Sequence, residues 1–286
     1  MSSRSPQPPR GTLYVVATPI GNLGDISTRA RQILGQVAVV AAEDTRHTGQ
    51  LLHHLGISKP MVSLHEHNET QRATELLARL DGGEDVALVS DAGTPLISDP
   101  GFDVVRAVVG AGARVLPVPG ACAAIAALSV AGLPTDRFIF EGFLSAKSGA
   151  RQAHLETLRS EPRTLVFYEA PHRIAETLES MSTVLGADRR AVVARELTKQ
   201  YESVYHGTLA ELVTRAAEDK DMSRGEIVIV VAGSTEVIES VKLDADKALR
   251  VLLEELPPAQ AAKLAAKLTG AKRSELYDKA VSLARS

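Results

Sequence analysis

Short apolar runs alternate with helical patterns along this chain, and the alternation constrains its fold more than any other feature. In the first half the runs cover residues 13–17, 37–42, 86–89 and 114–118. Their length and β-branched content are typical of buried strands. Between them, apolar residues recur at helical spacing over residues 70–80 and 102–109. The alternation predicts an α/β fold with a mainly parallel sheet covered on both faces.

A second α/β half follows a helix of small residues, 121–131, and a break at Gly132-Leu133-Pro134. We expect strands at residues 137–141, 164–168, 191–196 and 227–232, with helices at 151–159 and 172–185. Residues 198–208 alternate polar side chains with Val, Tyr and His, which predicts an antiparallel strand added to this sheet. A chain of 286 residues is long for one core, so two domains and an appendage are expected.

From Asp244 onward the pattern is purely helical, with Leu249, Leu252, Leu253 and Leu256 on one face. Residues 259–286 hold six Lys or Arg against two acids, a local charge of +4. This segment is either a small nucleic-acid-binding unit or a solvated helical cap, and the sequence favours neither. The expected divisions are a disordered tail at 1–10, α/β domains at 11–119 and 120–236, and a helical RNA-binding-like extension at 237–286.

The composition excludes several classes of protein. An apolar fraction of 44% and a charged fraction of 23% are typical of a globular protein. A net charge of −3 gives no overall attraction to nucleic acid or membrane, so any affinity for RNA must be local. The single cysteine, Cys122, excludes an intramolecular disulfide and fits a reducing compartment. No apolar run approaches the ~20 residues of a membrane span, so we expect a cytoplasmic protein without a membrane partner.

The segment most suggestive of a ligand site follows the run at 86–89 and covers residues 90–101, Ser-Asp-Ala-Gly-Thr-Pro-Leu-Ile-Ser-Asp-Pro-Gly. Its two prolines lack an N–H and its glycines tolerate a positive φ, so the segment resists both helix and sheet. Loops at the carboxyl ends of parallel strands are where α/β proteins hold ligands. From these residues alone, an ordinary turn-rich connector is an equal alternative.

Other motifs of known chemistry are incomplete. The two glycines of residues 18–25 match neither the Gly-x-Gly-x-x-Gly of a dinucleotide site nor a P-loop. His65, His67 and Glu69 share one side of an extended segment, but no cysteine or third histidine stands at ligand spacing, so no metal is expected. Cys122 has no partner histidine placed by the sequence, and no Gly-x-Ser-x-Gly elbow occurs. A reaction that needs mainly positioning, such as methyl transfer from a sulfonium, suits this inventory.

Several blocks of the chain resemble the tetrapyrrole methylase superfamily, and more closely its ribosomal branch, the ribosomal RNA small subunit methyltransferase I family. These blocks are residues 11–28, 42–52, 63–68, 88–101, 117–124, 135–148, 164–174, 194–198 and 225–231. The resemblance implies a two-domain tetrapyrrole-methylase-like fold with the cofactor cleft between the domains and a C-terminal helical appendage. It also implies a homodimer that transfers methyl from S-adenosylmethionine to a cytidine 2′-hydroxyl in 16S ribosomal RNA of the small subunit.

The resemblance further implies where the cofactor binds. Gly93-Thr94-Pro95 aligns with the Gly-Asp-Pro of the wider superfamily, so a role of that acidic residue is lost here or moved to Asp91. Backbone contacts are expected, because small residues let the main chain approach a ligand. The implied cofactor-binding residues are Asp91, Ala92, Gly93, Thr94, Pro95, Leu96, Ile97, Cys122, Ala123, Tyr168, Arg195, Glu196, Leu197, Gly225, Glu226 and Ile227.

On the acceptor side, the resemblance assigns residues 19–23 to the loop that faces the substrate. The residues expected to hold RNA are Asn22, Arg46, His47, Lys147, His172, Arg173, Lys272 and Arg273. A ribose hydroxyl is a weak acid, so a base should take its proton during methyl transfer. The candidates are Asp25, Glu43, Glu141 and Lys199, and the sequence does not choose among them. A structural ion pair or helix cap is an equal alternative for each.

Three other functions compete with this one. A tetrapyrrole (precorrin-type) C-methyltransferase is the principal alternative, but it would not need the basic helical segment after Asp244. A diphthamide-pathway methylase of the same superfamily would not be expected to carry the blocks at 43–48 and 65–68. A non-enzymatic RNA-binding module is disfavoured, because a two-domain cleft with a ligand loop is superfluous for binding alone.

Overall fold

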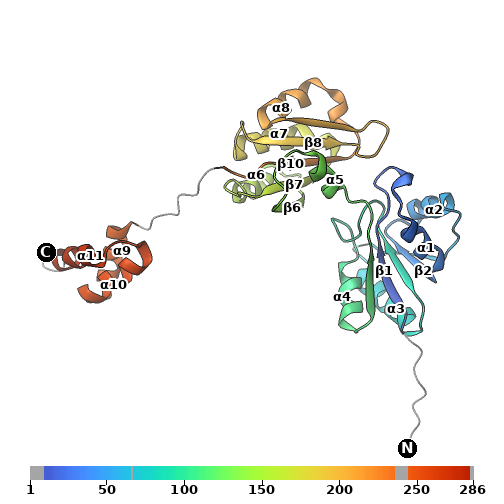
Figure 1. The fold of residues 1–286 in the computed structure, drawn as a ribbon, viewed down its shortest axis with the longest axis horizontal. Helices are drawn as coiled ribbons and strands as arrows, with labels where there is room; N and C mark the ends of the chain where they lie inside the picture. The colour runs from blue at the N-terminus through green and yellow to red at the C-terminus, as the bar shows by residue number, and fades with distance from the viewer. Residues whose placement is uncertain (1–9, 66, 236–243, 284–286) are drawn as a thin grey trace, which may run out of the picture. The chain divides into compact units, whose positions relative to one another are not determined.

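The computed structural model describes residues 10–65, 67–235 and 244–283, and within them β4 (Val86–Val89) is the central strand of a parallel sheet (Figure 1). The strand order is β3-β2-β4-β1-β5, and every neighbouring pair is parallel, as the sequence predicts for this half. The other strands are β1 (Thr12–Val16), β2 (Val39–Ala42), β3 (Met61–Ser63) and β5 (Arg114–Val118). Their carboxyl ends therefore open onto one edge of the sheet.

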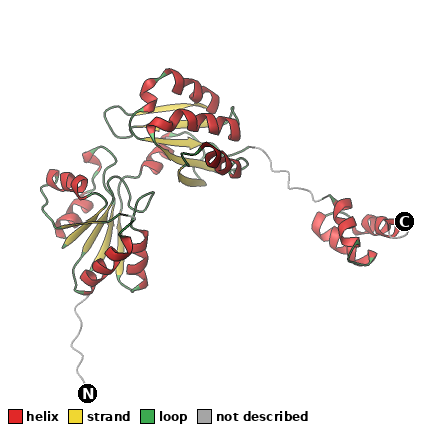
Figure 2. Cartoon of the chain, turned by 180° about the vertical axis from the view of Figure 1, so that it is seen from behind, coloured by secondary structure: helices red, strands yellow, loops and turns green. Residues whose placement is uncertain are grey.

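Helices cover both faces of this sheet (Figure 2). On one face lie α1 (Thr28–Gln36) and α2 (Thr45–His54), and on the other α3 (Glu69–Asp81) and α4 (Phe102–Gly110). Side chains of β2 alternate between the two layers, since Val39 packs with α3 and α4 while Val40 packs with α1 and α2. Burial on both faces explains why the inner strands β2 and β4 are apolar throughout.

The sequence did not predict α1, α2 or β3. Polar N-caps begin both helices: the Ser27 hydroxyl accepts from the Ala30 N–H at 3.0 Å, and the Asp44 carboxylate accepts from the Arg46 N–H at 2.8 Å. Both helices are mostly polar: the apolar residues of α1 are Ala30, Ile33 and Leu34, and those of α2 are Leu51 and Leu52. With so few apolar residues, a helical pattern is easily missed in the sequence.

A second sheet has the strand order β6-β7-β10-β8-β9. Its strands are β6 (Phe138–Phe143), β7 (Thr164–Glu169), β8 (Arg190–Arg195), β9 (Ser203–Thr208) and β10 (Ile227–Val231). The pair β6–β7 is parallel and the remaining pairs are antiparallel. The predicted antiparallel addition at 198–208 is confirmed in β9. The antiparallel pairings of β10 were not predicted, because a fully buried apolar run looks the same in either direction.

One face of the second sheet is covered by α6 (Ser148–Thr157), α7 (Ile174–Leu185) and α8 (Leu209–Glu218), of which α8 was not predicted. The other face is covered by α5 (Ala123–Val130), through small side chains such as Ala124 and Ala127. Although α5 directly follows the last strand of the first sheet, it therefore packs with the second. Three short 3₁₀ turns complete the described part of these halves, η1 (Leu23–Asp25), η2 (Pro171–Arg173) and η3 (Lys220–Ser223).

The chain divides into two compact units, residues 1–234 and 235–286. The second contains α9 (Ala245–Leu253), α10 (Pro258–Thr269) and α11 (Arg273–Leu283) around a small core that includes Leu249 and Leu276. Gly270, with a left-handed φ of 71°, ends α10. Leu252, Leu253 and Leu256 pack against the same core, so the predicted apolar face is confirmed.

Some expectations cannot be placed on this structure. The predicted tail, apart from Arg10, and the predicted boundary between residues 236 and 237 lie outside the described residues. Among those described, no helix combines the length and the apolar character that crossing a bilayer requires.

Candidate active site

The loop after β4, residues 90–101, is fixed by contacts from neighbouring loops. Thr18, after β1, exchanges main-chain hydrogen bonds with Gly93: the Thr18 N–H donates at 2.9 Å and the Gly93 N–H donates back at 3.1 Å. The Thr94 hydroxyl donates to the carbonyl of Ala121 at 3.0 Å. Thr94 thus ties this loop to the segment just before α5.

Glu69 holds the far end of the same loop. Its carboxylate accepts from the Gly101 N–H and the Asp103 N–H, each at 2.9 Å, and the residue is only 8% exposed. It therefore caps the N-terminus of α4, which lacks a side-chain cap of its own. In the segment considered as a metal site, His65 contacts the Asn68 side chain at 3.0 Å, and Glu66 lies outside the described residues. No group of three potential metal-binding side chains occurs among the residues described.

A cavity of about 360 Å³ lies against this loop, with walls from both α/β halves. This volume is in the range of small-molecule sites. The structure brings most of the expected cofactor residues to it: Ala92, Gly93, Thr94, Ile97, Cys122, Ala123, Tyr168, Leu197, Gly225, Glu226 and Ile227. Pro95 and Leu96 lie in the loop without lining the cavity, and Asp91 lines a second, adjoining cavity.

Arg195 and Glu196 hold two segments of the cavity wall together without lining it. The Arg195 guanidinium is buried and donates to the carbonyls of Arg224 at 2.8 Å and Tyr201 at 2.9 Å. The Glu196 carboxylate accepts from the Glu226 N–H at 2.9 Å. Both residues thus position the 225–227 segment, which does line the cavity.

Tyr168 forms the aromatic part of the wall. Its hydroxyl accepts from the Ala124 N–H at 3.2 Å, at the start of α5. The rings of Phe140 and Phe143 meet it edge to face, with centroids 4.9 and 5.6 Å away. Burial raises the pKa of Tyr168 far above its usual value, so the phenol stays neutral at physiological pH.

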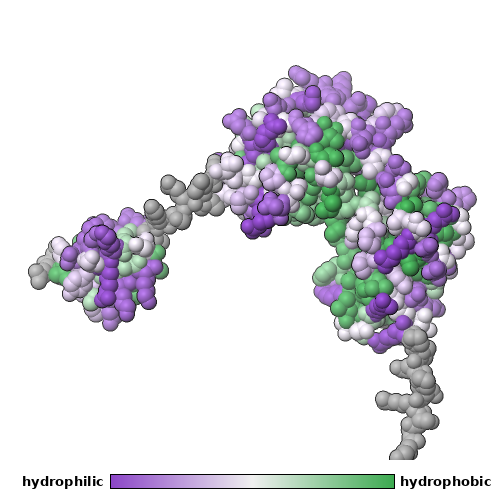
Figure 3. All heavy atoms as spheres, viewed as in Figure 1, coloured by the Kyte–Doolittle hydropathy of each residue, from purple (hydrophilic) through white to green (hydrophobic). Residues whose placement is uncertain are grey.

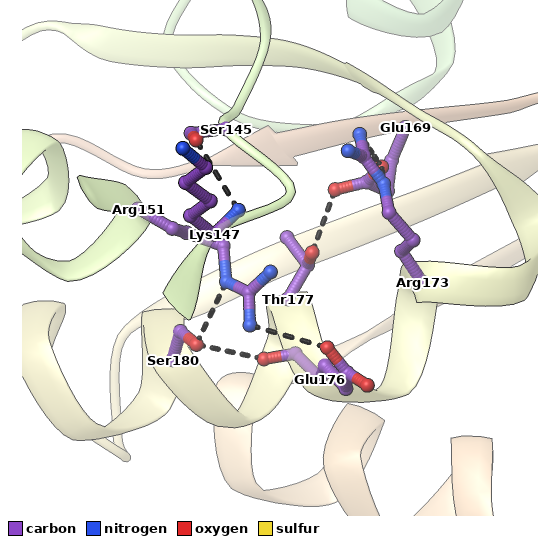
Figure 4. Close-up of polar contacts among 8 residues, drawn as sticks. All are labelled: Ser145, Lys147, Arg151, Glu169, Arg173, Glu176, Thr177 and Ser180. Carbon is purple, nitrogen blue, oxygen red and sulfur yellow. Dashed lines mark hydrogen bonds and ion pairs between the residues drawn. The ribbon is translucent and has the colours of Figure 1, made fainter. Parts of the chain in front are cut away.

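Among the described residues, the charged side chains that line this cavity are all acidic: Asp99, Glu169 and Glu226. The charge of Glu169 is compensated, because its carboxylate pairs with Arg173 and accepts a hydrogen bond from the Thr177 hydroxyl at 2.6 Å (Figure 4). Glu226 pairs with the Lys199 ammonium at 3.1 Å. Within the described part of the chain, no comparable cation lies beside Asp99. The described lining of this cavity is thus mainly apolar, with acids as its charged groups, which favours a cationic ligand.

A second cavity of about 290 Å³ adjoins the first and shares Ile20, Ala92 and Glu226 with it. It is lined by the loop that the resemblance assigned to the acceptor, including Pro19, Gly21 and Leu23. Its polar lining is different in character, with His47, Gln50, Asp91 and Lys199. A ligand in the first cavity and one in the second would therefore meet at the shared wall.

Of the four candidate bases, the one that lines either cavity is Lys199. Asp25 is exposed in η1, and Glu141 contacts His154 at 2.9 Å. Glu43 accepts from the Asp91 N–H at 3.4 Å. Burial raises the pKa of Glu43, and the nearby carboxylates of Asp99, Asp91 and Asp44 add to this effect.

Lys199 is held as a cation. Its ammonium lies 2.8 Å from a Glu196 carboxylate oxygen and 3.1 Å from one of Glu226. Burial favours the neutral amine, but hydrogen bonds to these two carboxylates outweigh it and raise the pKa of Lys199 above its usual value. A protonated lysine cannot accept a proton, so Lys199 is poorly suited to be the base.

The expected RNA-binding residues are dispersed, and among them His47 lines the second cavity. The Asn22 side chain accepts from the Gly24 N–H, and Arg46 pairs with Asp44 at 2.7 Å while staying 89% exposed. Lys147 is exposed at the N-cap of α6, where its N–H donates to the Ser145 hydroxyl at 3.2 Å (Figure 4). His172 and Arg173 form η2, and Lys272 and Arg273 lie at the start of α11 in the other unit.

Several lining residues of the first cavity were not predicted from the sequence. They are Ile20, Ser98, Asp99, Phe143, Glu169, Ala170, Pro171, Ala194 and Val228. Ser98 and Asp99 belong to the loop already singled out, and the unusual backbone there brings them to the cavity: Leu96 and Ser98 have left-handed φ values of 74° and 66°. No sequence pattern marks a left-handed conformation at leucine or serine. Glu169 and Ala170 directly follow Tyr168 along the chain. Their closeness in sequence to that predicted residue was the signal from which they could have been predicted.

Comparisons with known proteins identify the family of this chain. Residues 12–213 match the family described as tetrapyrrole (corrin/porphyrin) methylases, and residues 239–284 match a domain described as the RsmI C-terminal HTH domain. A protein of Pseudomonas aeruginosa named ribosomal RNA small subunit methyltransferase I is 56% identical over 95% of this chain and 97% of its own. A Xylella fastidiosa protein of the same name is 58% identical over 93% of this chain and 98% of its own.

Solved structures show the same fold at lower identity. The methyltransferase CobJ is similar with a TM-score of 0.59 and 18% identity, over 78% of this chain and 95% of that one. A Thermus thermophilus uroporphyrin-III C-methyltransferase, complexed with S-adenosylhomocysteine, is similar with a TM-score of 0.54 and 20% identity, over 78% and 97%.

Proposed function

This chain belongs to the tetrapyrrole (corrin/porphyrin) methylase family and, within it, groups with the ribosomal RNA small subunit methyltransferase I proteins; we propose that it methylates a cytidine 2′-hydroxyl in small-subunit ribosomal RNA. The methyl donor in this proposal is S-adenosylmethionine. The structural observation that carries it is the pair of adjoining cavities, one apolar and acidic, the other lined by His47, Asp91 and Lys199. This pair provides separate places for a cationic donor and a polar acceptor.

The first cavity fits S-adenosylmethionine by its chemistry. The cofactor carries a sulfonium and an ammonium against one carboxylate, so it is a net cation, and the described charged residues of this wall are all acidic. The adenine ring requires flat apolar surfaces, which Tyr168, Leu197 and Ile227 provide. When bound there, S-adenosylmethionine supplies an activated methyl group whose departure needs no acid catalyst.

The residues of the second cavity would orient the ribose and accept the proton of its 2′-hydroxyl. Because Lys199 is protonated, its role in this proposal is to stabilise negative charge that develops on the attacking 2′-oxygen. Among the described residues, the second cavity has three other titratable groups, Asp91, His47 and Glu226, and Glu226 already pairs with Lys199. The proton acceptor is then Asp91 or His47. The Asp44 N–H donates to one oxygen of Asp91 at 3.0 Å, which fixes the carboxylate in place.

The C-terminal unit supplies a basic surface for RNA. Lys272 and Arg273 lie where the turn after α10 enters α11. The Lys272 side chain is 80% exposed and lies 3.4 Å from the carboxylate of Glu275, which is also exposed. Lys279 has a structural role instead, since its ammonium lies 2.8 Å from the Asp246 carboxylate of α9. Exposed cations at this turn would contact RNA phosphates, and the cavity between the α/β halves would select the nucleotide. We expect this to take place in the cytoplasm.

We also propose that the active form is a homodimer. Large apolar side chains remain exposed on the α/β halves, with Phe102 62% and Val109 60% exposed on α4 and Ile125 53% exposed on α5. In Figure 3, apolar surface gathers over both α/β halves. Exposed apolar patches of this kind favour association, and a second copy is the partner we assign.

The test of the proposed function is methylation of a mapped nucleotide. The protein is incubated with labelled S-adenosylmethionine and small ribosomal subunits from a strain that lacks it, and the labelled nucleotide is identified. We expect one labelled cytidine ribose, and none with a variant in which Gly93 is replaced by Val. Label on a tetrapyrrole, on protein or on no substrate would overturn the assignment.

Single substitutions in the same assay distinguish the two proton acceptors. If Asp91 accepts the proton, Asp91→Asn should lower the rate about 100-fold or more while His47→Gln keeps most of it. If His47 accepts the proton, the two variants should behave the other way round.

A further inference from the structure

Asp99 differs from the other acids of the first cavity in having no cation beside it among the described residues. Glu169 pairs with Arg173, and Glu226 pairs with Lys199. Within its own loop, the polar groups that act on Asp99 are the Ser90 hydroxyl and the Asp91 carboxylate. The structure thus places one carboxylate in a partly buried position at the cavity wall, and no positive charge from the described chain compensates it.

The remaining groups that act on Asp99 are also negative or neutral. Glu43, from the segment after β2, and Asp91, from its own loop, both repel it, and the neutral phenol of Tyr168 faces it from β7. No lysine, arginine or histidine lines this cavity among the described residues. A carboxylate in this situation is costly to keep ionised, because neither water nor a cation stabilises it fully.

The backbone that presents Asp99 is itself unusual. Both Leu96 and Ser98 adopt left-handed conformations, which are uncommon for residues other than glycine. The loop is anchored on either side of them, by Thr18 at Gly93 and by Glu69 at Gly101. Strained conformations that are held by their surroundings cluster at ligand sites, where they aim a side chain.

We propose that Asp99 recognises a positive charge of the methyl donor and sets the preference of the cavity for a cationic cofactor. This inference rests on the proposed function and adds to it a residue that the resemblance does not assign. In the free protein the charge of Asp99 is uncompensated, and binding of a sulfonium or ammonium group stabilises it. Asp99 is therefore a residue of cofactor specificity, separate from the base that takes the ribose proton.

The protonation of Asp99 gives an independent signature. Burial raises the pKa of Asp99 above its usual value, and repulsion by Asp91 adds to this, while the Ser90 hydroxyl opposes it. A bound cation stabilises the ionised form and lowers this pKa again. Binding of a cationic ligand therefore releases protons as the pH approaches the raised pKa, and affinity weakens as the pH falls through it.

The experiment compares three ligands by calorimetry on the full-length protein. S-adenosylmethionine carries a sulfonium together with the ammonium and carboxylate of its amino-acid part. S-adenosylhomocysteine keeps the ammonium and carboxylate but has no sulfonium, and 5′-methylthioadenosine has none of the three. We expect Asp99→Asn to weaken the affinity for S-adenosylmethionine about ten-fold or more and to leave the affinity for 5′-methylthioadenosine unchanged. If the affinity for S-adenosylhomocysteine falls by the same factor, Asp99 contacts the ammonium. If that affinity does not change, Asp99 contacts the sulfonium.

The matched control is Asp103→Asn, which neutralises a nearby carboxylate that already pairs with Arg106 at 2.8 Å outside the cavity. It should bind all three ligands as the wild type does. Unchanged binding of S-adenosylmethionine to Asp99→Asn, or equal weakening of all three ligands, would overturn the inference. Failure of the wild type to bind either charged ligand would instead contradict the proposed function.

A second measurement applies even if Asp99→Asn does not fold. The enthalpy of S-adenosylmethionine binding to the wild type is measured between about pH 4 and 7 in buffers of different ionisation enthalpy. Release of protons that grows as the pH falls towards the raised pKa supports the inference. A constant proton balance over this range contradicts it.

Discussion

Thr18 and Gly93 join the loops after β1 and β4 by two reciprocal main-chain hydrogen bonds, 2.9 and 3.1 Å long. This bridge is what makes two loops far apart in sequence into one wall between the two cavities, because Ile20 and Ala92 on either side of it line both. A Cβ on Gly93 would lie 3.3 Å from Ile20 Cγ2, and its φ of 81° suits glycine.

Gly93→Val should therefore weaken S-adenosylmethionine binding by at least about ten-fold, since both strain and crowding act at the cavity wall. Calorimetry measures the affinity. The control is Gly112→Val, because Gly112 also has a left-handed φ of 69° but nothing lies within 4 Å of the added Cβ. Equal affinity in the two variants would show that the Gly93 contact does not shape the site.

Glu69→Ala should destabilise the α/β unit by about 2 kcal/mol, because two main-chain N–H groups at the start of α4 lose their acceptor. Denaturant unfolding of the full-length protein measures the change. Glu69→Gln keeps one acceptor oxygen and should therefore lose less stability than Glu69→Ala. Equal stability of Glu69→Ala and the wild type would contradict the capping role.

Glu196→Gln should reduce stability by an amount that depends on pH. Burial opposes ionisation of Glu196, but hydrogen bonds from Lys199 and from the Glu226 N–H outweigh it and hold its pKa below the usual 4.5. A lowered folded-state pKa contributes stability that is present above the unfolded value and is lost as the pH falls through the folded value. The difference between variant and wild type should thus be full at pH 7 and shrink below about pH 4.

Unfolding midpoints measured from neutral to acidic pH test this dependence. Glu218→Gln, at an exposed position of α8, serves as the control and should show no such trend. A difference that does not change with pH would mean that the Glu196 charge is not the source of the stabilisation.

Replacement of both Lys272 and Arg273 by Ala should raise the KM for small ribosomal subunits several-fold and leave the cofactor affinity unchanged. Because fewer cations then neutralise RNA phosphates, binding should also become less sensitive to salt. Lys220→Ala, in η3, is the control for removal of an exposed cation elsewhere. A matching loss of cofactor affinity would show that the C-terminal unit does not act through RNA.

Ile125→Glu together with Val109→Glu should convert a dimer into monomers, because two charges are placed on exposed apolar positions of α5 and α4. Sedimentation measures the oligomeric state. Val251→Glu changes an equally exposed apolar residue of α9, 57% exposed, and should leave the dimer intact. A wild type that sediments as a monomer would remove the basis for this proposal.

The fold of the first half was largely readable from sequence, because a parallel sheet buried on both faces leaves apolar runs with helical patterns between them. Strands 86–89 and 114–118 were predicted with the bounds that β4 and β5 have. The polar helices α1 and α2 were missed, because they hold few apolar residues and their stability comes from packing onto β1, β2 and β4.

The sequence by itself determined the chemistry of the site loop and, through its resemblance to known methylases, the kind of reaction. The tertiary structure decided which of the described charged side chains have a partner of opposite charge. Arg173 and Lys199 were expected to face RNA or the acceptor, but the fold pairs Arg173 with Glu169 and Lys199 with Glu196 and Glu226. Asp99 is left without a cation from the described residues. Charge compensation depends on distances between segments far apart along the chain, and spacing in sequence carries no record of them.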